Sequence, residues 1–116
     1  MRVLVVEDDD DVLAMMRSLL TRAGHEPLLA SSPLSALATC KASRPDFALL
    51  DIGLPEMDGY SLAERLRDDC GLGNVQMWAV SSYADNERRR RQSGIVGHIQ
   101  KPISFAHIQQ LIGVGN

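Results

Sequence analysis

The sequence predicts an α/β fold: a doubly wound parallel sheet of five strands covered by helices on both faces, in a single domain. Three observations predict it. Short apolar segments alternate with segments of helical periodicity along the whole chain. Residues 3–6 and 47–50 are continuously apolar, as in strands that are buried on both faces. The length of 116 residues allows one hydrophobic core but no second folded module.

Each predicted element has local support in the sequence. The first strand, residues 3–6, is followed by a helix that Asp9 or Asp10 can cap and that Gly24 ends. A Ser-Pro pair opens the second helix at residue 33. Further strands are expected at 28–30, 47–51, 75–81 and 98–100, and further helices at 33–42, 60–69, 85–93 and 105–112.

Pro27 lies where the second strand should begin. Proline is tolerated mainly at strand starts and on edge strands, so the second strand is expected at an edge of the sheet. That placement predicts the strand order 2-1-3-4-5, in which ligands bind outside the carboxyl ends of the strands.

Composition and charge exclude several classes of protein. The net charge of -3 argues against binding of the nucleic-acid backbone as the main activity. Cys40 and Cys70 are far apart in sequence, which indicates neither a metal site nor a disulfide framework and favours a reduced, cytoplasmic setting. No apolar segment is long enough for a signal peptide or a membrane span, so a soluble chain is expected.

Polar residues follow four of the predicted strands. Glu7 and Asp8 end the first strand, Asp51 ends the third, Ser81 ends the fourth, and Lys101 follows the fifth. Carboxylates brought together at one sheet edge repel one another, and a hard divalent cation such as Mg²⁺ relieves that repulsion. A carboxylate is also a competent nucleophile toward phosphorus, and a cation, an ammonium and a hydroxyl can neutralise the phosphoryl oxygens.

Four motifs together resemble the receiver domain of response regulators in two-component signalling. They are Val-Val-Glu-Asp-Asp at residues 5–9, Leu-Leu-Asp-Ile-Gly-Leu-Pro-Glu-Met-Asp-Gly at 49–59, Val-Ser-Ser at 80–82 and Lys-Pro at 101–102. The resemblance covers residues 1–116 and implies a flavodoxin-like (βα)5 fold. It also implies that Asp51 is phosphorylated in a Mg²⁺-dependent reaction. The stretch after Asp51 is similar to receivers of hybrid sensor histidine kinases.

The resemblance assigns further roles at this site. It implies that Asp8, Asp51 and the backbone carbonyl of Gly53 hold Mg²⁺, and that Glu7 assists through water. It implies that Lys101 and Ser81 stabilise the phosphoryl group. The Lys101-Pro102 peptide bond is expected to be cis.

The resemblance also implies a switch. Ser81 is expected to move toward the phosphoryl group while a ring on the fifth strand turns inward. The aligned ring is His98, where the family more often has phenylalanine or tyrosine, and a plain strand histidine is the alternative. The residues expected to shape the pocket are Ser82 and Tyr83 at its rim, and Pro55, Gly59 and Pro102 in its loops; Asp58 is expected to cap the next helix.

The expected partners are a sensor histidine kinase or a histidine phosphotransfer protein. The face formed by the fourth helix and fifth strand is a candidate surface for a homodimer or an output partner. Residues 88–91 are four arginines, which fit either a partner surface or a solvated helix. No nucleic acid or membrane is expected to bind, and the chain is expected to catalyse only its own phosphorylation and dephosphorylation. Trp78 is expected in the core, and His25 and His107 at the surface.

Three rival interpretations fit less well. A phosphohydrolase of the haloacid dehalogenase type needs a second acid two residues after its nucleophile, but Gly53 stands there. A flavodoxin-like cofactor carrier needs a phosphate loop after the first strand, where this chain has acids. A receiver that no longer takes phosphate would have lost one of the essential residues, yet all of them are present.

Overall fold

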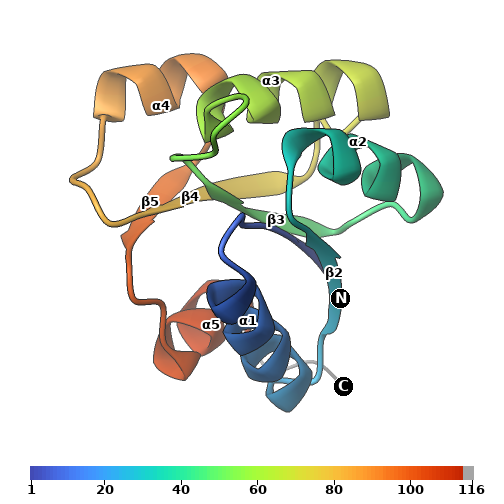
Figure 1. The fold of residues 1–116 in the computed structure, drawn as a ribbon, viewed down its shortest axis with the longest axis vertical. Helices are drawn as coiled ribbons and strands as arrows, with labels where there is room; N and C mark the ends of the chain where they lie inside the picture. Colours follow the sequence, from blue (N-terminus) through green and yellow to red (C-terminus); the bar gives the residue numbers. More distant parts are fainter. Residues whose placement is uncertain (114–116) are drawn as a thin grey trace.

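A computed structural model of the chain describes residues 1–113. Within them, strands alternate with helices and form one parallel sheet (Figure 1). The strands are β1 (Arg2–Val6), β2 (Glu26–Ala30), β3 (Phe47–Asp51), β4 (Gln76–Ser81) and β5 (Gly97–Gln100). The helices are α1 (Asp10–Arg22), α2 (Pro33–Ala42), α3 (Gly59–Cys70), α4 (Glu87–Ser93) and α5 (Phe105–Ile112). The order β2-β1-β3-β4-β5 confirms the predicted topology.

The largest differences from the sequence expectation are at the starts of β2 and α4, and the other boundaries agree to within one residue. β2 begins at Glu26 and contains Pro27, which pairs with Val3 of β1. An edge strand tolerates this proline because one of its sides has no partner strand. α4 begins at Glu87 because the side chain of Asn86 caps it, accepting a hydrogen bond from the Arg89 backbone N–H at 3.2 Å.

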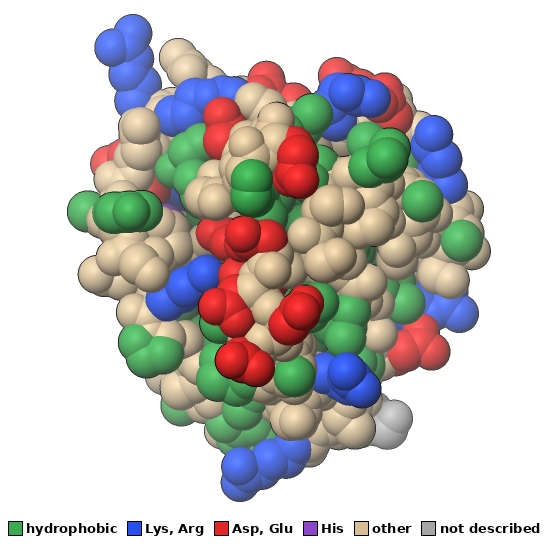
Figure 2. Space-filling view, viewed as in Figure 1, with side chains coloured by type: hydrophobic (Ala, Val, Ile, Leu, Met, Phe, Trp, Pro, Cys, Tyr) green, Lys and Arg blue, Asp and Glu red, His purple; other side chains and the backbone are tan. Residues whose placement is uncertain are grey.

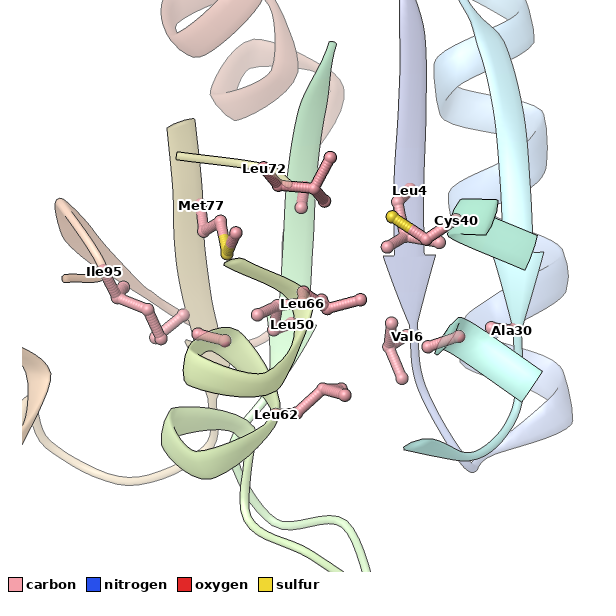
Figure 3. Packing of buried hydrophobic residues seen from close by; sticks show 14 of the residues in the cluster. Leu4, Val6, Ala30, Cys40, Leu50, Leu62, Leu66, Leu72, Met77 and Ile95 are labelled. Carbon is pink, nitrogen blue, oxygen red and sulfur yellow. The ribbon is translucent and has the colours of Figure 1, made fainter. Parts of the chain in front are cut away.

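Alternation along the strands sends side chains to two separate cores. In β1, Val3 and Val5 face α1 and α5, whereas Leu4 and Val6 face α2 and α3. All four are at most 2% exposed, which confirms strands buried on both faces. Figure 3 shows the core on the α2 and α3 side of the sheet, where Leu4 lies beside Cys40 and Val6 near Ala30, and Leu62 and Leu66 of α3 belong to the same cluster. The result is a three-layer arrangement with α1 and α5 on one face of the sheet (Figure 1).

Aspartate side chains start two of the helices. Asp9 caps α1 by accepting hydrogen bonds from the backbone N–H groups of Asp11 and Val12, at 2.9 and 3.2 Å. Asp58 caps α3, as expected, by accepting from the Ser61 N–H at 2.8 Å. These caps fix the two loops that leave the carboxyl ends of β1 and β3.

The histidine expectation was wrong for His25. This side chain is 6% exposed, and its ring nitrogens contact the Met1 amine at 3.2 Å and the Gly113 carbonyl at 2.9 Å. His107 is half-buried at the start of α5. Trp78 packs against the core between the sheet and α1 and α5, as expected. In residues 1–113, the helices are all too short or too polar to cross a membrane.

Candidate functional site

Three acidic side chains converge at the carboxyl edge of the sheet. Val6 of β1 is paired with Leu50 of β3, so the residues that follow them, Glu7 and Asp51, are neighbours. Asp8 comes next along the chain, and one carboxylate oxygen from each of the three acids lies within 4.8 Å of the others. Figure 2 shows acidic side chains gathered near the centre of this face of the molecule.

Lys101 brings a positive charge into the same group. Its backbone N–H donates to the Ser81 carbonyl at 2.8 Å, which holds the segment after β5 beside the end of β4. Its ammonium Nζ then donates to Glu7 Oε2 at 2.7 Å and reaches Asp51 Oδ2 at 3.5 Å. Lys101 therefore connects β5 to the acids of β1 and β3.

Burial and charge shift the pKa values of this pair. Burial raises the pKa of Glu7, and the nearby Asp51 charge raises it further, although the hydrogen bond from Lys101 opposes both. Burial lowers the pKa of Lys101, but the hydrogen bond to Glu7 and the charge of Asp51 outweigh burial, so its pKa is raised. Lys101 is thus held as a cation, while the charges of Glu7 and Asp51 repel each other.

The oxygen donors fit a hard divalent cation. With all three acids ionised, three carboxylates against one ammonium leave an excess of two negative charges. Asp51 and Glu7 are 7% and 4% exposed, so water screens this repulsion poorly. Carboxylate oxygens at this spacing are the ligands that Mg²⁺ prefers. The donor set therefore matches the predicted cofactor.

The turn after β3 shapes the position of Asp51. The Gly53 backbone N–H donates to Asp51 Oδ1 at 2.9 Å, which fixes one oxygen of the carboxylate. A side chain at Gly59 is excluded, because its Cβ would lie 2.5 Å from the Asp51 carbonyl oxygen. Pro55 lies exposed in the same turn, and the Lys101-Pro102 bond is cis, as expected.

Within residues 1–113, neither Ser81 nor His98 forms a hydrogen bond to Glu7, Asp8 or Asp51. Ser81 is 5% exposed, and its Oγ accepts from the Tyr83 N–H at 2.9 Å. His98 lies beside Ala79 of β4, half-buried, and its Nε2 is buried with no partner among residues 1–113. Ser82 is exposed, and Tyr83 is 78% exposed.

An apolar pocket that was not predicted from the sequence lies beside the acids. This pocket has a volume of about 100 Å³ and lies between α1 and the segment after β5. Its apolar walls include Val12, Met15, Met16 and Ile103, and Glu7, Asp51 and Lys101 border it. Met15, which lines this pocket from α1, is 38% exposed. The adjacent methionines on α1 were the only available signal.

The four arginines of α4 are not a uniformly solvated surface. Arg89 pairs with Glu64 of α3 at 2.8 Å, and Arg90 pairs with Asp85 at 3.0 Å. Arg91 pairs with Glu87 one turn earlier. Among residues 1–113, Arg88 alone of the four makes no ion pair. Two of the arginines therefore hold α4 in place.

Comparison with known proteins gives consistent results. Residues 3–113 match the family described as response regulator receiver domain. The polar-differentiation response regulators DivK of Brucella anthropi and Brucella ovis are each 36% identical over 112 residues, which cover 95% of this chain and 91% of each relative.

Solved structures show the same fold. The chemotaxis protein CheY4 of Vibrio cholerae superposes with a TM-score of 0.89 at 22% identity, covering 94% of this chain and 92% of that one. A response regulator receiver domain protein from Methanospirillum hungatei gives 0.86 at 27% identity, covering 96% and 89%. Together with the match over residues 3–113, these relatives place the chain in the response regulator receiver domain family of two-component systems.

Proposed function

We propose that Asp51 accepts a phosphoryl group in a Mg²⁺-dependent reaction. The donor is the phospho-histidine of a sensor histidine kinase or of a histidine phosphotransfer protein. The observation that carries the proposal is the convergence of Glu7, Asp8 and Asp51 with the Lys101 ammonium at the carboxyl edge of the sheet. A receiver domain that only binds partners would not need this costly group of acids.

In the proposed reaction a carboxylate oxygen of Asp51 attacks phosphorus. The nitrogen–phosphorus bond of the donor breaks, and the imidazole leaves with the bonding electron pair and takes up a proton. The Asp51 carboxylate is held for attack, because the Gly53 N–H binds Oδ1 at 2.9 Å. Lys101, already 3.5 Å from Oδ2, follows the phosphoryl oxygens as negative charge moves onto them.

Asp8, Asp51 and the Gly53 carbonyl are the residues proposed to hold Mg²⁺, with Glu7 acting through water. When bound, the cation neutralises the acids and the phosphoryl oxygens. Glu7 also orients Lys101 through the 2.7 Å hydrogen bond. The acids therefore have distinct tasks, since Asp51 is the nucleophile and Glu7 and Asp8 prepare its surroundings.

The response to phosphorylation is proposed to pass through β4 and β5 to α4. Ser81 is proposed to exchange its contact with the Tyr83 N–H for a phosphoryl oxygen, and His98 to move with it. The Nε2 of His98 is buried and has no hydrogen-bond partner among residues 1–113, so a movement that gave it a partner would be favourable. This supports the proposed role of the ring in the switch. Ser82 and Tyr83 at the rim would control the entry of hydrolytic water, and Pro55, Gly59 and Pro102 would maintain the loops.

The surface formed by α4 and β5 is then the one proposed to engage an output partner or a second copy. We further infer that residues 1–116 act as one receiver domain in the cytoplasm. In this role the chain catalyses only its own phosphorylation and dephosphorylation. It does not bind nucleic acid itself.

The experiment is intact-protein mass spectrometry after incubation with acetyl phosphate, with Mg²⁺ or with EDTA. The expected result is one phosphoryl adduct in Mg²⁺ and none in EDTA or in Asp51→Asn. Asp8→Asn should lower the yield at limiting Mg²⁺, whereas the matched control Asp10→Asn, an exposed acid outside the cluster, should not. An adduct that persists in Asp51→Asn, or none in wild type, would reject the proposal.

A further inference from the structure

The fold brings the two cysteines together although they are far apart in sequence. Cys40 lies near the end of α2, and Cys70 is the last residue of α3. The Cys70 thiol donates a hydrogen bond to the Leu37 carbonyl at 3.8 Å, and Leu37 lies one helical turn before Cys40. Both cysteines pack in the same apolar core, where α2 and α3 run side by side (Figure 1).

The two thiols differ in their access to solvent. Cys40 is 4% exposed, whereas Cys70 is half-buried at the helix end. Burial raises the pKa of Cys40 to about 12, the neighbouring Cys70 thiol adds to the rise, and the cation of Arg44 opposes it. Arg44 also donates to the Gly71 carbonyl at 2.9 Å, so its guanidinium binds the residue that follows Cys70. Cys70 is therefore the thiol that a reagent meets first.

A metal site does not explain this pair. Among the described residues, the only group of three or more side chains that could hold a metal ion is Glu7, Asp8 and Asp51. Two thiols without a third ligand form no zinc site. The other reaction that two neighbouring thiols can undergo together is oxidation to a disulfide.

We propose that Cys40 and Cys70 are a redox-sensitive pair that a peroxide converts into a disulfide joining α2 to α3. The Cys70 thiolate attacks a peroxide oxygen, the oxygen–oxygen bond breaks, hydroxide leaves, and Cys70 becomes a sulfenic acid. The Cys40 sulfur then attacks the Cys70 sulfur. The sulfur–oxygen bond breaks, and the hydroxyl leaves with the Cys40 proton as water. Two thiols are oxidised and one peroxide is reduced.

Proximity makes the second step possible despite the high pKa of Cys40. The thiol is held beside its target, so the reaction is intramolecular. The sulfurs must approach to about 2.0 Å. Cys70 can move because it ends α3, where Gly71 with φ of 68° turns the chain away.

The disulfide would close a loop that contains β3, Asp51 and α3. Such a cross-link stabilises the fold mainly by restricting the unfolded chain. The cysteines lie at the ends of α2 and α3, toward the amino edge of the sheet, whereas Asp51 lies at its carboxyl edge. Oxidation is therefore expected to raise stability without blocking the acidic site.

The test treats the full, reduced chain with hydrogen peroxide in the presence of EDTA, followed by intact-mass and peptide analysis. The expected product is a monomer that has lost two hydrogen masses, yields a linked peptide pair containing Cys40 and Cys70, and reverts with dithiothreitol. Its Tm should rise by on the order of 10 °C. Peroxide also oxidises methionine, and the double variant Cys40→Ala/Cys70→Ser is the control for that reaction. Its Tm should not rise.

Single variants separate the two thiols. Cys40→Ala, which keeps the buried site apolar, should leave Cys70 to gain oxygen, whereas Cys70→Ser should leave Cys40 unreacted at the same dose. The linked peptides are measured in wild type, so this result holds even if a variant fails to fold. A peroxide dose that oxidises Cys70 in Cys40→Ala should also form the disulfide in wild type. If both thiols of the treated wild type can still be alkylated after unfolding, the proposal is overturned. Disulfide-linked dimers as the sole product would also overturn it.

Discussion

Helices α3 and α4 lie side by side on the same face of the sheet, but different forces hold them (Figure 1). α3 buries an apolar stripe that includes Leu62 and Leu66, both 0% exposed. α4 has the sequence Glu-Arg-Arg-Arg-Arg-Gln-Ser, and Ser93 is its one buried residue. Its attachments are mainly ion pairs, through Arg89 and Arg90.

This difference shows how one face can be both rigid and responsive. Moving α3 would expose core side chains to water, at a cost of about 25 cal/mol for each Å² of apolar surface. Moving α4 breaks partly exposed ion pairs, each worth roughly 0–1 kcal/mol. The element next to the proposed switch strand β5 is therefore the one that moves at low cost.

The largest expected effect comes from shortening a core side chain of α3. Leu66→Ala leaves a cavity under the helix and should lower the free energy of unfolding by about 2–5 kcal/mol. Urea unfolding followed by circular dichroism measures the change. Arg88→Ala, on the exposed side of α4, is the control and should have almost no effect. Equal effects for the two variants would remove the distinction between the helices.

A smaller effect is expected from Arg90→Ala. This side chain is 14% exposed, pairs with Asp85 and donates to the Ile95 carbonyl at 3.3 Å. Its removal should cost about 1 kcal/mol and leave α4 less protected in hydrogen exchange, with α3 unchanged. Arg90→Lys, which keeps the charge but loses the paired donors, should fall between. Loss of protection in α3 as well would show that the two helices move as one unit.

Arg89→Ala should have a smaller effect, about 0.5 kcal/mol. Arg89 is 30% exposed, pairs with Glu64 and lies over the Tyr60 ring at 5.5 Å. Because salt screens such pairs, the difference from wild type should shrink at high ionic strength. Thermal unfolding at low and high salt measures this. A difference that does not change with salt would assign the effect to packing.

Tyr60 gives a pH-dependent probe of the buried side of α3. Burial raises its pKa above 10.0, and the charge of Asp85 on the α4 side adds to the rise. The folded state then holds this proton at a pH where the unfolded chain has lost it, so Tyr60 should lower stability as the pH rises above the unfolded pKa. No effect is expected near neutral pH. Absorbance titration of Tyr83→Phe, in which Tyr60 is the one tyrosine left, should show ionisation above 10; ionisation at or below 10 would contradict burial of the ring.

Apolar periodicity, helix caps and the rule that parallel strands end at one edge of a sheet predicted most of the fold and the centre of the site. Residues 47–51 and 105–112 were placed correctly because apolar periodicity and helix caps are local signals. Glu7, Asp51 and Lys101 could be brought together because parallel strands end at one edge. Such arguments need no side-chain detail.

Contacts between distant segments could not be predicted in this way. The Arg89–Glu64 pair and the meeting of Cys40 with Cys70 depend on how helices are rotated against each other. His25 is buried because Met1 and Gly113 close over it, which periodicity does not report. Sequence patterns identify a buried face but not the partner that covers it.

The most direct test of the central claim is the location of the phosphoryl group after reaction with acetyl phosphate and Mg²⁺. Borohydride reduces an aspartyl phosphate to homoserine, which peptide mass spectrometry then places in the chain. The account predicts homoserine at position 51 alone, in the peptide that contains β3. Homoserine at position 8 or at another acid, or a phosphoryl adduct without any homoserine, would contradict the assignment of Asp51 as the phosphoacceptor.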